Sequence, residues 1–176
     1  MSNRTSSNIR NKLIGKQTGV SSVEFAVIGA VSLMILFGCL EVSRLLFTVN
    51  VLEEATRRGA RVAAVCTVNS ALIAQTAVFN ADAGGSGEPL PNLTTDNIQV
   101  EYLNETGTTI GNPAPVSGSP GTTGFESIRY VRVQIINYEH TMVIPGLNIS
   151  FTTRGYPTTI PSEALGIAPF GQTSSC

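Results

Sequence analysis

The sequence predicts an α+β protein in which a long N-terminal helix, transmembrane and then amphipathic, packs on a small antiparallel β-sheet. Two observations predict this class. Helix formers dominate residues 20–79, which contain no proline, and alternating apolar residues recur between turn residues in the part that follows. With 176 residues, the chain has room for one domain plus one special segment.

Residues 1–19 form a predicted leader peptide. They contain four basic residues and no acidic one, and Gly15 and Gly19 disfavour a helix. Their polar composition predicts disorder. Because positive charge stays on the cytoplasmic side of a membrane span, the leader also predicts a cytoplasmic N-terminus.

Residues 20–47 form a predicted transmembrane helix. Sixteen consecutive residues, 25–40, carry no charge. A helix needs about 20 apolar residues to cross a bilayer, and this stretch suffices if Glu24 and Arg44 lie near the two interfaces. A cleaved secretory signal is the alternative, but the apolar run passes directly into an amphipathic pattern without an A-x-A-like site. Everything after Arg44 is therefore expected in the periplasm.

Residues 48–79 continue the span as a predicted amphipathic helix that packs on a folded domain, with a break expected near Asn69 and Ser70. Ala55, Gly59 and Ala63 form a row of small residues at four-residue spacing. Such a row favours the close approach of another element. Ordinary alanine-rich helix composition explains the row equally well.

Residues 80–176 are predicted to form a β-rich periplasmic or extracellular domain. A short return strand is expected at 108–110, after a turn at 104–107, and three prolines predict an irregular tail from Pro157 onward. The main predicted strands are 98–103, 128–136 and 147–153.

Catalytic, metal and cofactor sites are not expected in this chain. The three cysteines lack metal-ligand spacing, no nucleotide-binding fingerprint occurs, and the single histidine, His140, is expected on the surface or in a loop. Beyond the leader, the chain carries 11 − 4 = 7 basic and 12 acidic residues, with no basic stripe. This balance excludes nucleic-acid binding, which needs clustered cations.

Glu24 is the most informative residue of the predicted span. A carboxylate at the start of an apolar helix is costly unless it is paired, so it indicates a functional site. Lys16 lies across the Gly19 break, and Arg44 lies about 30 Å further along the helix. We therefore expect a partner created by processing or supplied by another subunit. An interfacial glutamate at an ordinary signal anchor is the alternative.

The residues around Glu24 carry a family resemblance. The stretch Lys16-Gln-Thr-Gly-Val-Ser-Ser-Val-Glu-Phe25 resembles the class III signal of type IV pilin-like precursors, with glycine ending a basic leader and glutamate at the fifth mature position. A wider pattern over about residues 16–66 resembles the TadE-like minor pilins of tight-adherence (Flp) pilus systems. That pattern comprises Val23-Glu-Phe-Ala26, Phe37-Gly38, Glu41, Arg44, Ala55, Gly59 and Arg61.

This resemblance implies a pilin-like fold and a function in a type IVb-like pilus. A prepilin peptidase would cut between Gly19 and Val20, and the new amino group of Val20 would meet Glu24 of a neighbouring subunit, with Phe25 also in the assembly segment. The implied partners are other pilin or pseudopilin subunits and an inner-membrane assembly platform. The implied location is the bacterial inner membrane, and after assembly the cell surface, where the pilus mediates attachment.

Two alternatives to a polymerising subunit stay open. The chain could be a membrane-anchored periplasmic accessory of a pilus or secretion system. A periplasmic enzyme on an anchor is the third class, and the missing catalytic motifs disfavour it. An uncut leader would favour the accessory, whereas recovery in sheared surface filaments would favour the pilin.

Glu41, Arg44 and the cysteines complete the predicted sites. Glu41 and Arg44 are spaced to pair on a helix and to mark the end of the span, with pairing between subunits as the alternative. Cys66 and Cys176 should both face an oxidising periplasm and form a disulfide. Cys39 lies within the apolar run, where we expect a small buried hydrophobe that stays reduced.

Overall fold

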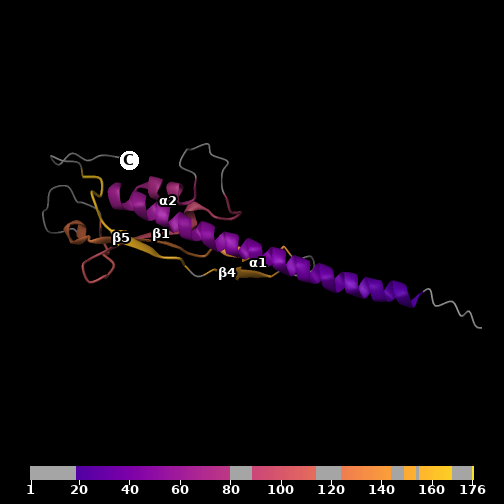
Figure 1. Cartoon of the computed structure of the whole chain (residues 1–176). Coiled ribbons are helices and arrows are strands. Elements are labelled where there is room, and N and C mark those ends of the chain that lie inside the picture. Colours follow the sequence, from indigo (N-terminus) through magenta and orange to yellow (C-terminus); the bar gives the residue numbers. More distant parts are fainter. Residues whose placement is uncertain (1–18, 80–88, 114–123, 144–148, 154, 168–175) are drawn as a thin grey trace, which may run out of the picture. The chain divides into compact units, whose positions relative to one another are not determined.

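The computed structural model describes residues 19–79, 89–113, 124–143, 149–153, 155–167 and 176. The chain divides into two compact units, Met1–Val42 and Ser43–Cys176. The helices and strands along the chain are drawn in Figure 1. They are α1 (Val20–Val65), α2 (Ala71–Ala77), η1 (Thr95–Asn97), β1 (Ile98–Leu103), η2 (Gly124–Ser127), β2 (Tyr130–Ile135), β3 (Glu139–Thr141), β4 (Ser150–Thr152) and β5 (Thr158–Pro161).

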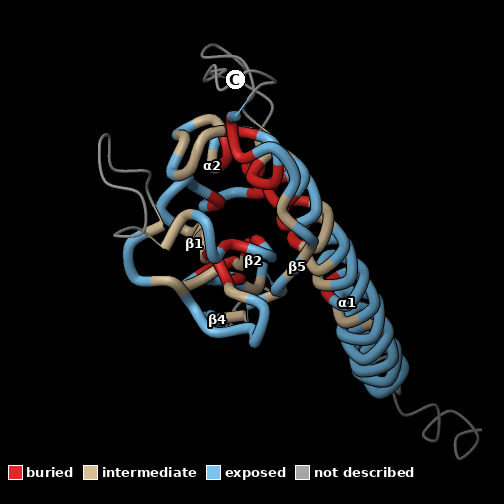
Figure 2. The backbone as a smooth tube through the Cα atoms, turned by 90° about the vertical axis from the view of Figure 1, so that its left-hand side faces the viewer, coloured by how far each residue is buried: buried red, intermediate tan, exposed pale blue. Residues whose placement is uncertain are grey.

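Within the first unit, the large apolar side chains of α1 are exposed. Phe25 is 79% exposed and Met34 is 73% exposed, although both are large and apolar. The pale blue tube of Figure 2 shows this exposure along the early turns of α1. The described residues of this unit, 19–42, therefore do not supply the burial that these apolar side chains need.

Within the second unit, α1 buries one face. The buried positions recur every three or four residues, which is the period of a helix side that packs on a core. They are Thr48, Leu52, Ala55, Thr56, Gly59, Ala60, Ala63 and Ala64. The amphipathic pattern that predicted packing on a folded domain is therefore confirmed.

The helical region breaks where the sequence predicts it. Helix α1 ends at Val65, and α2 begins at Ala71 with Ser70 as its N-cap. Asn69 adopts the left-handed backbone conformation, with φ of 61°. Asparagine tolerates that conformation better than most residues, so it can reverse the chain between two helices.

The main sheet has three antiparallel strands in the order β1-β2-β5. Strand β1 pairs with β2 from Ile98 opposite Ile135 to Leu103 opposite Tyr130. Strands β3 and β4 form a separate antiparallel pair. Strands β1 and β2 confirm the predictions at 98–103 and 128–136, and β4 lies within the predicted strand at 147–153, whereas β3 was not predicted. The predicted return strand at 108–110 is reduced to one bridge between Leu103 and Thr109.

The prediction of an irregular tail is wrong at β5, which pairs with β2 from Tyr130 opposite Pro161 to Val133 opposite Thr158. Pro161 is compatible with this strand because β5 lies at the edge of the sheet. A proline at the end of an edge strand removes no essential ladder hydrogen bond. Pro169, the third proline of the predicted tail, lies outside the described residues.

The core lies between α1 and the sheet and has two clusters. Ala60 and Ala63 pack with Val131 and Val133 in one cluster. Leu52 and Ala55 pack with Ile135, Tyr138, Leu90 and Leu93 in the other. The row of small residues lies at this contact. A Cβ atom added to Gly59 would lie 3.0 Å from Ala77 Cβ and 3.1 Å from Val133 Cγ1, so the row allows α2 and β2 to approach α1 closely.

Candidate functional site

The predicted processing junction lies at the start of α1. Gly19 and Val20 are both exposed, and an added Cβ at Gly19 would have no neighbouring atom within 4 Å. The Val23 amide donates a hydrogen bond to the Gly19 carbonyl oxygen at 3.4 Å, which makes Gly19 the residue that begins the first turn. The Gly19–Val20 bond is therefore sterically open at the helix end.

Glu24 and Phe25 lie in the second turn of α1 and are exposed. Glu24 follows Val20 by four residues, so the two positions share one face of the helix. The described surface around them is apolar, as Val23, Val27 and Ile28 are each more than half exposed. Glu24 is thus a carboxylate on an apolar helix surface, which is the setting in which a cationic partner has the largest effect.

The apolar part of α1 fits the dimensions of a bilayer. An 18-residue window within this helix has a mean hydropathy of 2.3, and none of the window is buried in the chain. Polar side chains in the span can bond to its backbone: the Ser32 hydroxyl donates to the Ile28 carbonyl oxygen at 2.8 Å. This candidate span indicates that the chain is anchored in a membrane.

Glu41 and Arg44 lie three residues apart on α1, as predicted. Glu41 is only 7% exposed, although it is a carboxylate in an apolar stretch, whereas Arg44 is exposed. The two residues flank the boundary between the compact units, which falls between Val42 and Ser43. Their pairing with each other or across subunits stays a prediction.

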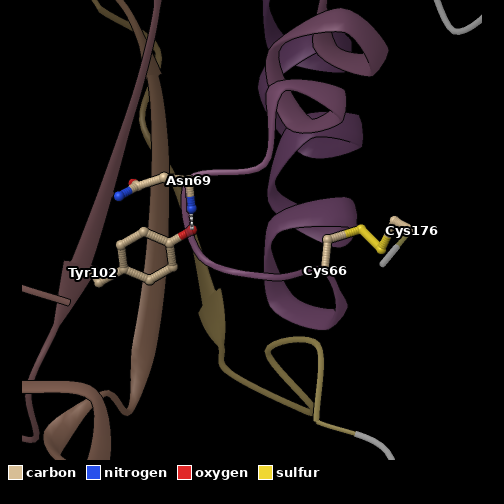
Figure 3. The surroundings of a disulfide bond; sticks show 4 residues. All are labelled: Cys66, Asn69, Tyr102 and Cys176. Carbon is tan, nitrogen blue, oxygen red and sulfur yellow. Dashed lines mark hydrogen bonds between the residues drawn. A yellow bond between two sulfur atoms is a disulfide. The ribbon is translucent and has the colours of Figure 1, made fainter. Parts of the chain in front are cut away.

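The disulfide between Cys66 and Cys176 joins the chain end to the residue that follows α1 (Figure 3). The two Cα atoms are 5.6 Å apart, and the bond spans 110 residues of sequence. This is the pair that the sequence predicted. Cys39 takes no part in it and is exposed on α1, so the chain itself does not bury this thiol.

A hydrogen bond fixes the same end of α1 next to the disulfide. The Asn69 amide donates to the Tyr102 hydroxyl at 3.2 Å, which ties the chain reversal to β1 (Figure 3). Tyr102 is 2% exposed. Burial raises the pKa of the Tyr102 phenol, and the hydrogen bond from Asn69 opposes that effect.

The prediction for His140 is wrong. The residue lies in β3, is 3% exposed, and stacks at a tilt on Phe151 with 5.2 Å between ring centroids. Its Nδ1 lies 3.4 Å from the Thr48 hydroxyl on α1. A lone histidine can be buried here because Thr48 offers a polar contact on the packed helix face. In the sequence, the charged Glu139 between Tyr138 and His140 was the available signal for a strand. In the structure Tyr138 and His140 are buried and Glu139 is exposed, as in a strand with one face on the core.

A pocket of about 380 Å³ lies beside His140. Burial raises the pKa of the Tyr138 phenol at its wall, while the nearby Arg44 charge lowers it. Among the described residues, no group of three or more histidine, cysteine or acidic side chains is placed to hold a metal ion. The residues that line this pocket include Arg44, Phe47, Thr48, Tyr138, His140 and Val143.

Comparison with known proteins gives a family match that covers most of α1. Residues 19–61 match the family described as TadE-like protein, which is a pilus-associated structural family. Neither the curated proteins nor the solved structures gave a match. The matched segment includes Gly19, Glu24, Glu41, Arg44 and Gly59, and it ends before Cys66 and the sheets. Residues 19–61 are therefore similar to the TadE-like family, as the sequence resemblance indicated, and we refer to them as the TadE-like segment.

Proposed function

We propose that this chain is a minor pilin or pseudopilin of a tight-adherence (Flp, type IVb-like) pilus. The TadE-like segment supports an association with such a pilus, and the candidate membrane span supports insertion before assembly. In this proposal the domain from Ser43 onward faces the periplasm and later the cell surface. The assembled pilus mediates attachment.

Processing by a prepilin peptidase comes first. The enzyme cuts between Gly19 and Val20, which leaves a mature chain of 176 − 19 = 157 residues. The exposed helix start with open space around Gly19 supports access to this bond. The cut removes the basic leader and creates an ammonium group at Val20.

Assembly with other pilin or pseudopilin subunits on an inner-membrane platform follows. The observation that carries this step is Glu24, an exposed carboxylate on a helix whose apolar side chains are also exposed. When such helices bundle, an unpaired Glu24 would be buried at high cost, whereas the Val20 ammonium of a neighbouring subunit would compensate its charge.

Replacing Glu24 by alanine tests this proposal. Loss of one partner from a buried ion pair costs about 3–5 kcal/mol, so Glu24→Ala should be inserted and cut but not assembled. Immunoblots of membrane and sheared-surface fractions should show mature protein only in the membrane, and intact mass should confirm the cut. Glu53→Ala is the matched control, because Glu53 is a half-exposed glutamate on the same helix beyond the apolar part.

Equal surface recovery and attachment for Glu24→Ala and wild type would contradict the assembly role. That result would favour the non-polymerising accessory, which has no use for the Glu24 charge. Finding only full-length chain beside an active peptidase would contradict the processing step.

A further inference from the structure

From Tyr138 to Val143, the chain runs along the part of α1 that belongs to the second unit, toward the residue where that part begins. Tyr138 packs in the cluster that contains Leu52, the His140 ring meets Thr48, and Val143 lines the same pocket as Arg44. From Leu52 to Thr48 the helix rises about 6 Å, and from Tyr138 to His140 the strand advances about 6.6 Å, so these two contacts follow each other along both elements. Val143, which follows β3, is therefore level with the first turn of α1 in the second unit.

Apolar side chains are exposed at this end of the unit. Val143 is 65% exposed, Ile149 is 46% exposed and Phe47 is 56% exposed. The Met142 amide donates to the Ile149 carbonyl oxygen at 3.0 Å, which holds the two arms of the hairpin side by side. We refer to Phe47, Val143 and Ile149 as the hairpin patch.

The distribution of exposed apolar residues in the second unit is uneven. Among its described residues, seven large hydrophobic ones are exposed, and four of them belong to the hairpin end or to the adjoining turn of α1. These four are Leu46, Phe47, Val143 and Ile149. The concentration indicates one contact surface, since single exposed apolar residues are otherwise normal.

A lipid interface is the occupant that fits this surface. Leu46 and Phe47 are exposed and come soon after the first unit in the sequence, so the patch lies at the end of the second unit that follows the candidate span along the chain. Arg44 lines the pocket beside Phe47 and Val143. An arginine beside apolar and aromatic groups is typical of the headgroup boundary, where its charge reaches phosphate and water.

We propose that the hairpin patch dips into the outer leaflet of the membrane that α1 crosses, and that this second contact fixes the orientation of the periplasmic domain before assembly. The inference rests on the membrane-spanning role of α1 and not on filament formation. A second copy is a poorer occupant, because three side chains fall far short of the roughly 20 residues per partner in a stable protein interface.

Depth-dependent fluorescence quenching tests the proposal. The full-length chain carries Cys39→Ser, keeps its disulfide, and receives one labelled cysteine at Ile149 or at Ile167. Both isoleucines are 46% exposed, but Ile167 follows Gly166, whose amide bonds to Val65 at the opposite end of this part of α1. The probe is a vesicle of phosphatidylethanolamine and phosphatidylglycerol that contains nitroxide-labelled lipid.

The label at 149 should be quenched several-fold more by the nitroxide lipid than the label at 167, and less by aqueous iodide. Adding Val143→Asp should abolish the difference, whereas Thr159→Asp on β5 should preserve it, with near-UV circular dichroism confirming that both variants fold. Equal quenching at 149 and 167 would overturn the proposal. Lipid shielding at 149 that disappears when the protein is diluted in lipid would also overturn it, in favour of a second copy.

The outcome is separable from that of the proposed function. The vesicles contain no peptidase and no assembly platform, so the Glu24→Ala chain should show the same quenching as wild type. A failure of assembly in cells leaves this measurement unchanged. Loss of lipid quenching with normal surface recovery would refute the hairpin contact alone.

Discussion

The two parts of α1 are continuous in sequence, yet their apolar side chains find different surroundings. Residues 20–42 expose large apolar groups on all faces, whereas residues 43–65 bury one face against α2 and the sheet. The first part therefore depends on surroundings outside the chain, and the second part is stabilised by the chain itself.

Glycines make the contrast measurable. Gly29 and Gly38, in the first part, have no atom within 4 Å of an added Cβ, while Gly59, in the second, meets Ala77 and Val133 at close to 3 Å. The same residue type is thus a spacer in one part and a packing requirement in the other. The stability of the domain formed by the second unit should accordingly respond to changes in the second part alone.

Breaking the disulfide at the end of the second part should give the largest effect. Cys176→Ser opens a loop of 110 residues, and the chain-entropy model makes this worth about 4–5 kcal/mol of unfolding free energy. The measurement is urea unfolding of the full-length chain in lipid nanodiscs, followed by near-UV circular dichroism. Cys39→Ser in the first part is the matched control.

A change below about 1 kcal/mol for Cys176→Ser would mean that packing alone holds the chain end. A comparable loss of unfolding free energy for Cys39→Ser would show that the stability of the domain also depends on the exposed part of the helix.

Filling the row of small residues should give an intermediate effect. Gly59→Leu introduces a side chain where Ala77 Cβ and Val133 Cγ1 leave no space, and overpacking of this kind costs about 1–3 kcal/mol. The same substitution at Gly29 meets no neighbour within the chain, so it should leave the unfolding free energy of the domain unchanged. Equal unfolding midpoints for Gly59→Leu and wild type would show that α2 moves aside without cost.

The sequence was most informative where periodicity and burial coincide. The long helix, its break near Asn69, β1 and β2 were all predictable, because each presents an apolar face at helical or strand spacing. The disulfide was predictable from the expected compartment of its two cysteines. The residues that we propose for processing and assembly were suggested by the TadE-like pattern, and the family match over residues 19–61 includes them.

Local signals failed where tertiary context decides. Strand β5 carries Pro161, and only the position of β5 at the sheet edge makes that proline acceptable. His140 was expected at the surface because the Thr48 hydroxyl that accompanies its burial lies 92 residues earlier in the chain. The partner of Glu24 cannot follow from one chain, since the proposal assigns it to another subunit.

Removing the Tyr102 hydroxyl should give the smallest effect on the free energy of unfolding. It tests the single hydrogen bond that holds the chain reversal after α1. Tyr102→Phe deprives the Asn69 amide of its acceptor, which should cost about 1 kcal/mol near neutral pH.

The substitution should also change how the free energy of unfolding depends on pH. Because burial raises the Tyr102 pKa, the folded chain keeps this proton in a range where the unfolded chain releases it. The stabilising contribution is then complete below the unfolded pKa, about 10, and is lost as the pH rises through the folded pKa. Wild type should therefore lose stability more steeply than Tyr102→Phe above about pH 10, as measured by urea unfolding across alkaline pH. Tyr130→Phe is the matched control, because it removes a hydroxyl from a tyrosine 38% exposed on the neighbouring strand. Parallel alkaline curves for wild type and Tyr102→Phe would show that the phenol is accessible to water, and that the reversal after α1 is looser than its hydrogen bond to β1 implies.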